Sequence, residues 1–294
     1  MKGMTHDLEV AMNPQDTQTV AHVNGADLCL ETFGDRDDPA VLLIGSSMLT
    51  WPGDFCRRLA EDRFVIRYDM RDTGRSVSYG HRAAPYTLRD LVTDAMGLLD
   101  VLRLPAAHVA GFSVGGWIAQ LAALDHPAKV TSLTLIGTRP TAPGPADADL
   151  PEHDAELMQR MMSAPEPDWN DRESVIEHLV ESDRLFAGTA PIDEAARRAV
   201  AERTFDRTPD VAASLTNIAF IDHGARWRER LAEIKAPTLV LHGTHDRFFP
   251  YGNGVALARE IPGARLVPLE GVGHELPRHA WDTLLAELIA HTTG

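Results

Sequence analysis

The strongest constraint on the fold is the regular alternation of short apolar runs with helix-like segments. Runs typical of strands occupy residues 27–34, 40–45, 64–69, 107–113, 130–137, 237–243 and 264–271. A helical pattern separates most of them, and it is clearest in 87–102, where apolar residues recur near a period of 3.6. Because strands that alternate with helices are joined by right-handed crossovers, the chain is predicted to form an α/β fold around a mostly parallel sheet.

One interval interrupts this alternation. Residues 138–235 contain no run typical of a strand, and after a loop rich in Pro, Ala and Asp they show helical patterns. Those patterns cover 152–163, 172–186, 192–205 and 209–221. We therefore predict a helical cap, 138–235, inserted into a core made of residues 1–137 and 236–294. The first 16 or so residues are polar and aperiodic and are expected to form a loose arm.

The predicted cap carries many apolar side chains, and these predict a large, mostly apolar cavity between cap and sheet. Met and Phe suit adaptable apolar pockets. The residues concerned are Leu157, Met158, Met161, Met162, Phe186, Leu215, Ile218, Ala219 and Phe220. Such a cavity would favour a bulky hydrophobic substrate.

Charge and composition exclude several classes of partner. The formal net charge of −15 argues against nucleic acid and against anionic membrane surfaces. No stretch approaches the roughly 18 apolar residues of a membrane span, and the N-terminus lacks an apolar signal core. Cys29 and Cys56 are the two cysteines, and no CxxC pair or metal-spaced cluster exists. We expect a cytoplasmic protein whose cysteines are ordinary small hydrophobic residues.

The stretch GFSVG, residues 111–115, places one hydroxyl between two glycines at the junction of a predicted strand and helix. The pattern G-x-S-x-G is weak alone, but in this context it is typical of a nucleophile elbow, a sharp turn that exposes the serine above the sheet. Gly111 and Gly115 leave room for the turn, and the helix N-terminus favours negative charge near Ser113. We predict Ser113 as a catalytic nucleophile.

A serine nucleophile needs a base, and the base needs an orienting acid. In this architecture the acid follows a late strand and the histidine follows the last strand. Asp246, in LVLHGTHDRFFP, and His274, in LEGVGHELP, fit that order. The first carboxylate after the strand that ends at Gly137 is Asp147, which is too far along the chain to compete.

Other histidines and carboxylates near these positions are less suitable. His242 and His245 come too early to be the base, and His279 is expected inside the last helix. Glu270 and Glu275 are close to His274 in sequence, and contact with solvent is the expected role of both.

Backbone amides are expected to bind the negative oxygen that develops during acyl transfer. One donor should be Val114, which directly follows the nucleophile. The second should come from the loop after residues 40–45, where Ser46 is the first choice and Ser47 the alternative. The serine hydroxyls could contact substrate or only cap the following turn.

A charged segment, RYDMRDTGRS (67–76), follows another strand. Arg71 or Arg75 could bind a substrate anion. We favour a structural role, in which Asp69, Arg71 and Asp72 pair with one another and brace the sheet edge.

With these motifs in place, the chain resembles the α/β-hydrolase superfamily over nearly its whole length. The stretches DFCRRLAEDRFVIRYDMRDTGRS, GFSVGG, HGTHDRFFP and GVGHELP are similar to those of the aclacinomycin methylesterase-like esterases of actinobacteria, which act on polyketide antibiotics. The resemblance implies a mostly parallel eight-stranded sheet with a helical cap, a Ser113–Asp246–His274 triad, and hydrolysis of an ester such as a polyketide methyl ester. Many relatives carry His-Gly at the oxyanion loop, where this chain has Ile44-Gly45.

Taken together, these patterns predict a serine hydrolase that uses no metal or cofactor and cleaves a small hydrophobic ester. The same triad could cut a lactone, an amide or a C–C bond, or form a peracid, and a non-catalytic ligand-binding member of the fold is a further alternative. Dehalogenases and epoxide hydrolases of this fold use an Asp nucleophile, which Ser113 argues against. The oligomeric state is left open by the sequence.

Overall fold

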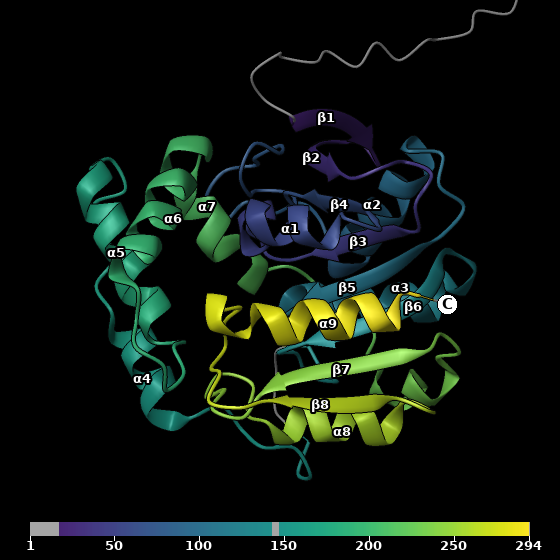
Figure 1. Ribbon diagram of the computed structural model, residues 1–294. Coiled ribbons are helices and arrows are strands. Elements are labelled where there is room, and N and C mark those ends of the chain that lie inside the picture. The colour runs from purple at the N-terminus through teal and green to yellow at the C-terminus, as the bar shows by residue number, and fades with distance from the viewer. Residues whose placement is uncertain (1–17, 143–146, 294) are drawn as a thin grey trace, which may run out of the picture.

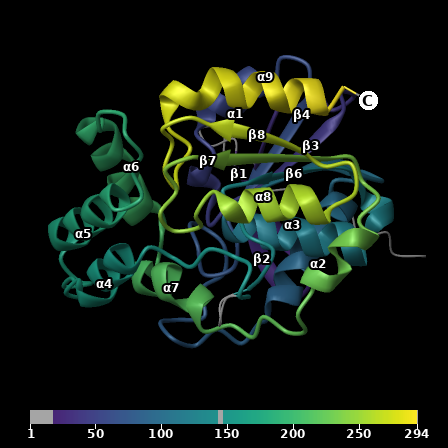
Figure 2. The same cartoon turned by 90° about the horizontal axis from the view of Figure 1, so that it is seen from below.

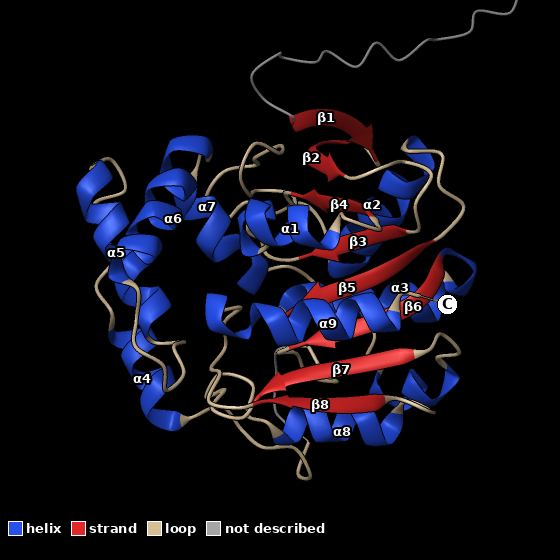
Figure 3. Cartoon of the chain, viewed as in Figure 1, coloured by secondary structure: helices blue, strands red, loops and turns tan. Residues whose placement is uncertain are grey.

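The computed structural model describes residues 18–142 and 147–293, so the predicted N-terminal arm lies outside the described residues. The strands are β1 (Gln18–Val23), β2 (Ala26–Phe33), β3 (Ala40–Ile44), β4 (Phe64–Tyr68), β5 (Ala107–Phe112), β6 (Val130–Ile136), β7 (Thr238–Gly243) and β8 (Arg265–Leu269). They form one sheet of eight strands in the order β1-β2-β4-β3-β5-β6-β7-β8 (Figures 1 and 3). Neighbours from β4 to β8 in this order pair in parallel, whereas β1–β2 and β2–β4 are antiparallel. The predicted mostly parallel sheet is confirmed.

Helices cover both faces of this sheet. Outside residues 138–235 they are α1 (Gly53–Leu59), α2 (Leu88–Val101), α3 (Val114–Asp125), α8 (Gly252–Glu260) and α9 (Trp281–His291), with short turns η1 (Met48–Thr50), η2 (Pro127–Lys129) and η5 (Arg278–Ala280). Figure 2 shows α1 and α9 on one face and α2, α3 and α8 on the other. Every residue of β3, β4 and β7 is buried, which explains why β3 is continuously apolar and why apolar residues predominate in the other two.

Strand β1 is the element that the sequence patterns did not predict. It forms a hairpin with β2 through Asn24 and Gly25, whose φ angles of 47° and 73° are both positive. Asn-Gly is the preferred pair for such a two-residue turn. The strand lies at the edge of the sheet and is only partly buried, so its sequence QTVAHV lacks a continuous apolar run.

Between β6 and β7, the described residues form helices and no strand. These helices are α4 (Ala155–Ser163), α5 (Arg172–Arg184), α6 (Glu194–Arg207), α7 (Val211–Thr216), η3 (Asn217–Ala219) and η4 (Arg228–Glu233). Figure 1 shows α4 to α7 beyond the carboxyl ends of the parallel strands. Helix α4 begins later than the predicted residue 152 because the Asp154 side chain accepts the Leu157 N–H as an N-cap. The division into core and cap stays a prediction.

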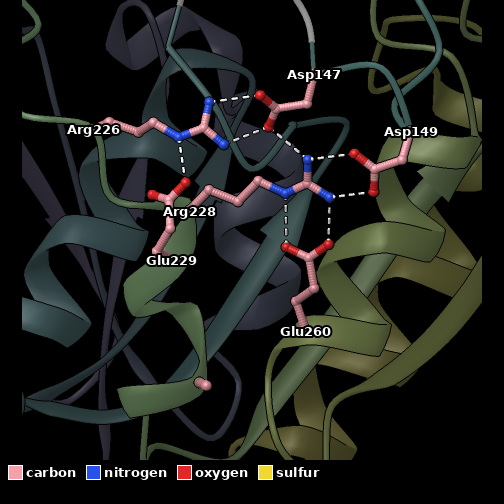
Figure 4. A pocket seen from close by; sticks show the side chains of 7 residues that line it. Asp147, Asp149, Arg226, Arg228, Glu229 and Glu260 are labelled. Carbon is pink, nitrogen blue, oxygen red and sulfur yellow. Dashed lines mark hydrogen bonds and ion pairs between the residues drawn. The ribbon is translucent and has the colours of Figure 1, made fainter.

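An ion-pair network joins the two chain segments that connect these helices to the sheet. Arg228 binds Asp149 and Glu260 at 2.6 Å and Asp147 at 2.5 Å, and Arg226 also binds Asp147 at 2.5 Å (Figure 4). Asp147 and Asp149 precede α4, the two arginines begin the return segment, and Glu260 ends α8. These side chains line a surface cavity of about 560 Å³. Arg228 contacts all three carboxylates, so the network fastens both connections to α8.

Candidate active site

Ser113 occupies a strained turn between β5 and α3. Its φ of 55° and ψ of −118° lie in a region that non-glycine residues rarely adopt. The flanking glycines permit this turn, because a Cβ at Gly111 would lie 2.2 Å from the Gly115 carbonyl oxygen and a Cβ at Gly115 would lie 2.2 Å from that of Ile44. The sharp turn and its glycines therefore have the geometry that the sequence pattern predicts.

His274 lies between Ser113 and Asp246. Its Nε2 is 2.9 Å from Ser113 Oγ, and its Nδ1 is 2.8 Å from Asp246 Oδ2. Asp246 follows β7 and His274 follows β8, so loops at the carboxyl ends of the strands bring all three residues together. Because Nδ1 faces a carboxylate acceptor, the proton of a neutral imidazole belongs on Nδ1, and Nε2 is free to accept the serine proton.

The Asp246 carboxylate is fixed by its own loop. Its Oδ1 accepts the backbone N–H groups of Phe248 at 2.9 Å and Phe249 at 2.7 Å. His242 Nε2 donates to the Phe249 carbonyl oxygen at 2.6 Å and lies 3.6 Å from Asp246 Oδ2. Burial lowers the pKa of His242, which is fully enclosed and therefore neutral. The sequence patterns exclude His242 as the base, and the structure places it beneath the acid.

An aromatic wall surrounds the His274 ring. The ring centroids of Phe248, Phe112 and Phe249 lie 5.0, 5.1 and 5.1 Å from that of His274, and Phe186 lies at 5.6 Å. Phe186 comes from the segment after α5, Phe112 ends β5, and the other two follow β7. These rings exclude water from the imidazole, and Phe112, Phe186 and Phe248 are only partly buried, so they offer apolar surface beside Ser113.

The two serines after β3 have different environments. Ser47 is the N-cap of η1: its Oγ accepts the Leu49 N–H at 3.2 Å, and its own N–H points to Thr50 Oγ1 at 3.4 Å. Ser46 is exposed, and its hydroxyl lies 3.3 Å from the same Thr50 oxygen. The Ser47 amide is therefore engaged in the cap of the turn.

Val114 is the first residue of α3, where amides have no partner within the helix.

The large apolar cavity expected under the cap is not found beside Ser46. The cavity there measures about 20 Å³, which is enough for about one water molecule. Asp72, Thr73 and Ser214 line it together with apolar groups. Several of the apolar side chains expected to line a cavity face outward instead, since Met162 is 83% exposed and Phe220 is 63% exposed.

The charged segment 67–76 braces the fold, but its partners differ from those predicted. Arg71 binds Asp94 of α2 at 2.7 Å, with both side chains buried. Asp69 binds Arg207 of α6 at 2.8 Å, and Asp72 accepts the Tyr86 hydroxyl at 2.8 Å. The expected pairing among Asp69, Arg71 and Asp72 is therefore wrong, because each finds a partner on a neighbouring element.

Two further expectations near His274 need correction. Glu275 does not face solvent: its side chain is 14% exposed and binds Arg197 at 2.7 Å. His279 lies in the short turn η5 rather than inside the last helix, which begins at Trp281. Glu270 is exposed, as expected.

Neither cysteine is suited to be a nucleophile. Burial raises the pKa of Cys29 to about 11 and that of Cys56 to about 12, so both thiols are protonated at neutral pH. Both are free and buried, in agreement with the prediction that they are small hydrophobic residues. Neither thiol therefore competes with Ser113, which has His274 beside it.

With this geometry in view, comparison with known proteins defines the class. The model of the alpha/beta hydrolase fold family matches residues 39–277, and the chain belongs to this family. It is 35% identical to rhodomycin D methylesterase DauP of Streptomyces sp. (strain C5) over 89% of this chain and 93% of that protein. Rhodomycin D methylesterase DnrP of Streptomyces peucetius is 34% identical over the same shares. The resemblance to methylesterases of this kind is confirmed.

Solved structures agree with this assignment. The enol-lactonase from Burkholderia xenovorans LB400 is 26% identical and superposes with a TM-score of 0.72. The match covers 94% of this chain and 100% of that one. An esterase, RhEst1 from Rhodococcus sp. ECU1013, has a TM-score of 0.73 at 20% identity over 95% of this chain and 99% of its own, and it supports the fold alone.

Among the described residues, no helix combines the length and apolar character that a membrane crossing requires.

Proposed function

We propose that this chain is a serine hydrolase that cleaves a carboxylic ester. The observation that carries the proposal is the continuous chain of contacts from Ser113 Oγ to His274 Nε2 at 2.9 Å and from His274 Nδ1 to Asp246 Oδ2 at 2.8 Å. In this proposal Ser113 is the nucleophile, His274 the general base and acid, and Asp246 the group that fixes the imidazole. Residues 138–235 act as a cap over a catalytic core of residues 1–137 and 236–294.

The reaction follows from these roles. Ser113 Oγ attacks the ester carbonyl while its proton moves to His274 Nε2, and Asp246 stabilises the imidazolium. The amides of Val114 and Ser46 bind the oxyanion; Ser46 is preferred to Ser47 because the Ser47 amide points to Thr50 Oγ1. His274 then protonates the leaving alcohol. A water molecule, deprotonated by His274, attacks the acyl-enzyme and releases the carboxylic acid together with Ser113.

The proposed substrate is a methyl ester of a polyketide-type natural product. Similarity to the rhodomycin D methylesterases over 89% of the chain supports this choice. The partly exposed rings of Phe112, Phe186 and Phe248 support it too, because aromatic side chains stack on polycyclic ring systems. Neither a metal nor a cofactor takes part in the proposed steps, and the cytoplasmic location stays a prediction.

Covalent labelling tests the nucleophile. A fluorophosphonate should modify the wild-type chain at Ser113 and abolish ester hydrolysis. Ser113→Ala should resist the label, keep its circular dichroism spectrum and lose about 10⁴-fold or more in kcat, because a triad nucleophile supplies that much. Hydrolysis by this variant at more than about a tenth of the wild-type rate would exclude Ser113 as the nucleophile, since the triad is worth far more.

An ester series tests the substrate class. Methyl esters of polycyclic aromatic acids should give the highest kcat/KM, with acetate esters of small alcohols and simple lactones well below. A lactone arm is included because the similar structure from Burkholderia xenovorans is an enol-lactonase. If kcat/KM fell steadily as acyl bulk increased, the polyketide assignment would fail while ester hydrolysis remained. A preference for lactones would mean that the enzyme cleaves a cyclic ester and not the methyl ester assigned here.

A further inference from the structure

Helix α6 reaches both loops that flank Ser113, through an arginine near each of its ends. Arg197 lies in its first turns and Arg207 is its last residue. A helix of 14 residues is about 20 Å long. Figure 1 places α6 among the helices beyond the carboxyl ends of the strands, where the catalytic loops emerge.

At one end, Arg207 binds the loop that carries Ser46. Its Nη1 lies 2.8 Å from Asp69 Oδ1, with side chains 7% and 0% exposed. The same Oδ1 accepts the backbone N–H of Met48 at 2.9 Å, two residues after Ser46. Arg207 Nη2 also lies 3.2 Å from Met48 Sδ. The position of the Ser46 loop thus depends on a buried carboxylate that α6 neutralises.

At the other end, Arg197 binds the loop that carries His274. Its Nη2 lies 2.7 Å from Glu275 Oε2, with side chains 12% and 14% exposed. The other oxygen of Glu275 accepts the Gly188 N–H at 2.7 Å, and the His274 N–H donates to the Phe186 carbonyl oxygen at 2.8 Å. Arg197 also donates to the Asp183 carbonyl oxygen at 2.9 Å. The histidine loop is therefore held by α6 and by the segment that precedes it.

The remaining surface of α6 makes these contacts distinctive. Ala201 is its one fully buried residue, whereas Arg198 is 44% exposed and binds Glu173 on the surface. Arginine is rarely buried unless it is paired, and a buried pair contributes little net stability compared with apolar packing. A helix that only covered the site would not need two enclosed arginines that bind the two loops beside Ser113.

We propose that Arg197 and Arg207 are positioning residues through which α6 aligns His274 and the Ser46 amide with Ser113. The inference rests on the proposed function of these groups and goes beyond it by assigning part of their alignment to the cap. Neither arginine contacts the reacting atoms. Each fixes the position of one loop. A displacement of that loop by about 1 Å would lower the reaction rate by up to about 100-fold.

The rate of fluorophosphonate labelling of Ser113 measures this alignment in the full chain. In that step Ser113 Oγ bonds to phosphorus, fluoride leaves, His274 takes the serine proton, and the phosphonyl oxygen requires the amides. Arg197→Met should slow labelling about 10-fold. Arg197→Lys should recover part of the loss. The matched control, Arg198→Met on the exposed face of the same helix, should label at the wild-type rate. A wild-type rate for Arg197→Met would overturn the role of Arg197.

A double-mutant cycle separates positioning from general loss of cap stability. If Arg197 acts through Glu275, the double variant Arg197→Met/Glu275→Gln should label no more slowly than the slower single variant. Losses that multiply would show independent effects and overturn the coupling. Melting temperatures of all three variants, measured in parallel, show whether the rates follow alignment or unfolding.

Arg207 needs a second variant because its loss leaves the enclosed Asp69 without the guanidinium that binds it. Arg207→Met should slow labelling about 10-fold if it folds. Arg207→Lys keeps the charge but not the fork that reaches both Asp69 and Met48, and it should label several-fold more slowly than wild type with an unchanged circular dichroism spectrum. A wild-type rate in folded Arg207→Lys would remove Arg207 from the proposal.

The readout also distinguishes this inference from the proposed function. If the wild-type chain is labelled at Ser113 but cleaves no ester, the assigned reaction is wrong, and the labelling rates of the variants still decide the role of α6. If the wild-type chain is not labelled, both proposals fail.

Discussion

Helices α3 and α6 are of similar length, but they are held in place by different forces. All but one of the 12 residues of α3 are buried, and the helix packs between sheet and α2. Ala201 alone is buried among the 14 residues of α6, whose arginines form ion pairs with Asp69, Glu173 and Glu275. Figure 2 shows the same contrast, with α3 against the sheet and α6 standing away from it. Apolar burial holds α3 in place, whereas α6 has one small apolar cluster with α5 and is otherwise attached by charge pairs.

This difference has consequences for dynamics and chemistry. Burial of apolar surface contributes about 25 cal/mol per Å², whereas an exposed ion pair contributes about 0–1 kcal/mol and a buried pair contributes little net stability after desolvation. The helices α4 to α7 should therefore open more readily than the sheet and show lower protection in hydrogen exchange. A rigid core suits the alignment of Ser113, and a less stable cap suits substrate entry. The predictions below test this comparison, beginning with the largest effect.

The largest effect is expected at the acid of the core. Asp246→Asn should lower kcat about 10⁴-fold with little change in substrate affinity, because an amide favours the wrong imidazole tautomer. The backbone donors of Phe248 and Phe249 can still bind the Asn oxygen, so the fold should persist. Glu270→Gln, an exposed change close to His274 in sequence, is the matched control and should keep wild-type kinetics. Comparable losses in both variants would mean that neither carboxylate has a specific role.

The next effect is on core stability. A Cβ at Gly115 would lie 2.2 Å from the Ile44 carbonyl oxygen, which belongs to the backbone of β3 and has little freedom to move. Gly115→Ala should cost about 3 kcal/mol, the upper end for overpacking, and lower Tm by about 6–12 °C. Gly53→Ala is the control, since its nearest neighbours are flexible guanidinium atoms at 3.4 Å or more. Equal melting temperatures for the two variants would show that the elbow is looser than the structure indicates.

The core and the cap also differ in how well their sequences predict them. Runs such as residues 40–45 and 237–243 predict buried strands because parallel strands are covered on both faces. The G-x-S-x-G pattern and the chain order Ser, Asp, His likewise predict which residues meet, since this fold brings the ends of particular strands together. Edge strand β1 was missed because half-exposed residues leave a mixed pattern, although Asn24-Gly25 is a recognisable hairpin signal.

Contacts made by the cap could not be predicted from the sequence. Asp69 and Arg207 are 138 residues apart, and Arg197 and Glu275 are 78 apart, so no local spacing indicates either pair. A charged residue in a loop is usually solvated, and Glu275 was therefore expected to contact solvent. The order β2-β4-β3-β5 is likewise a tertiary property, because neighbours in a sheet need not be neighbours in sequence.

The smallest effect is expected at the network where residues 138–235 join the core. Hydrogen bonds from Arg226 and Arg228 lower the pKa of Asp147 to about 2, and Arg228 lowers the pKa of Asp149. The pKa of an Asp in an unfolded chain is about 3.9. Because the folded pKa values are depressed, the contribution to stability is complete above about pH 4 and is lost as the pH falls toward about 2. Pepsin cleavage within 138–235 should therefore accelerate between pH 4 and 2 before cleavage in α3 does.

Arg228→Met should reproduce this loosening without acid, because it removes contacts to Asp147, Asp149 and Glu260 at once. At neutral pH we expect a drop in Tm of about 2–4 °C. Proteolysis within 138–235 should be faster, and the acceleration between pH 4 and 2 should be weaker than in the wild-type chain. High salt should narrow the difference, since the carboxylates are partly exposed and their pairs are screened. Arg203→Met, an exposed change on α6, controls for loss of one positive charge. If Arg228→Met and Arg203→Met were cleaved at the same rate, apolar packing rather than charge would hold the cap, and the contrast between α3 and α6 would not extend to its attachment.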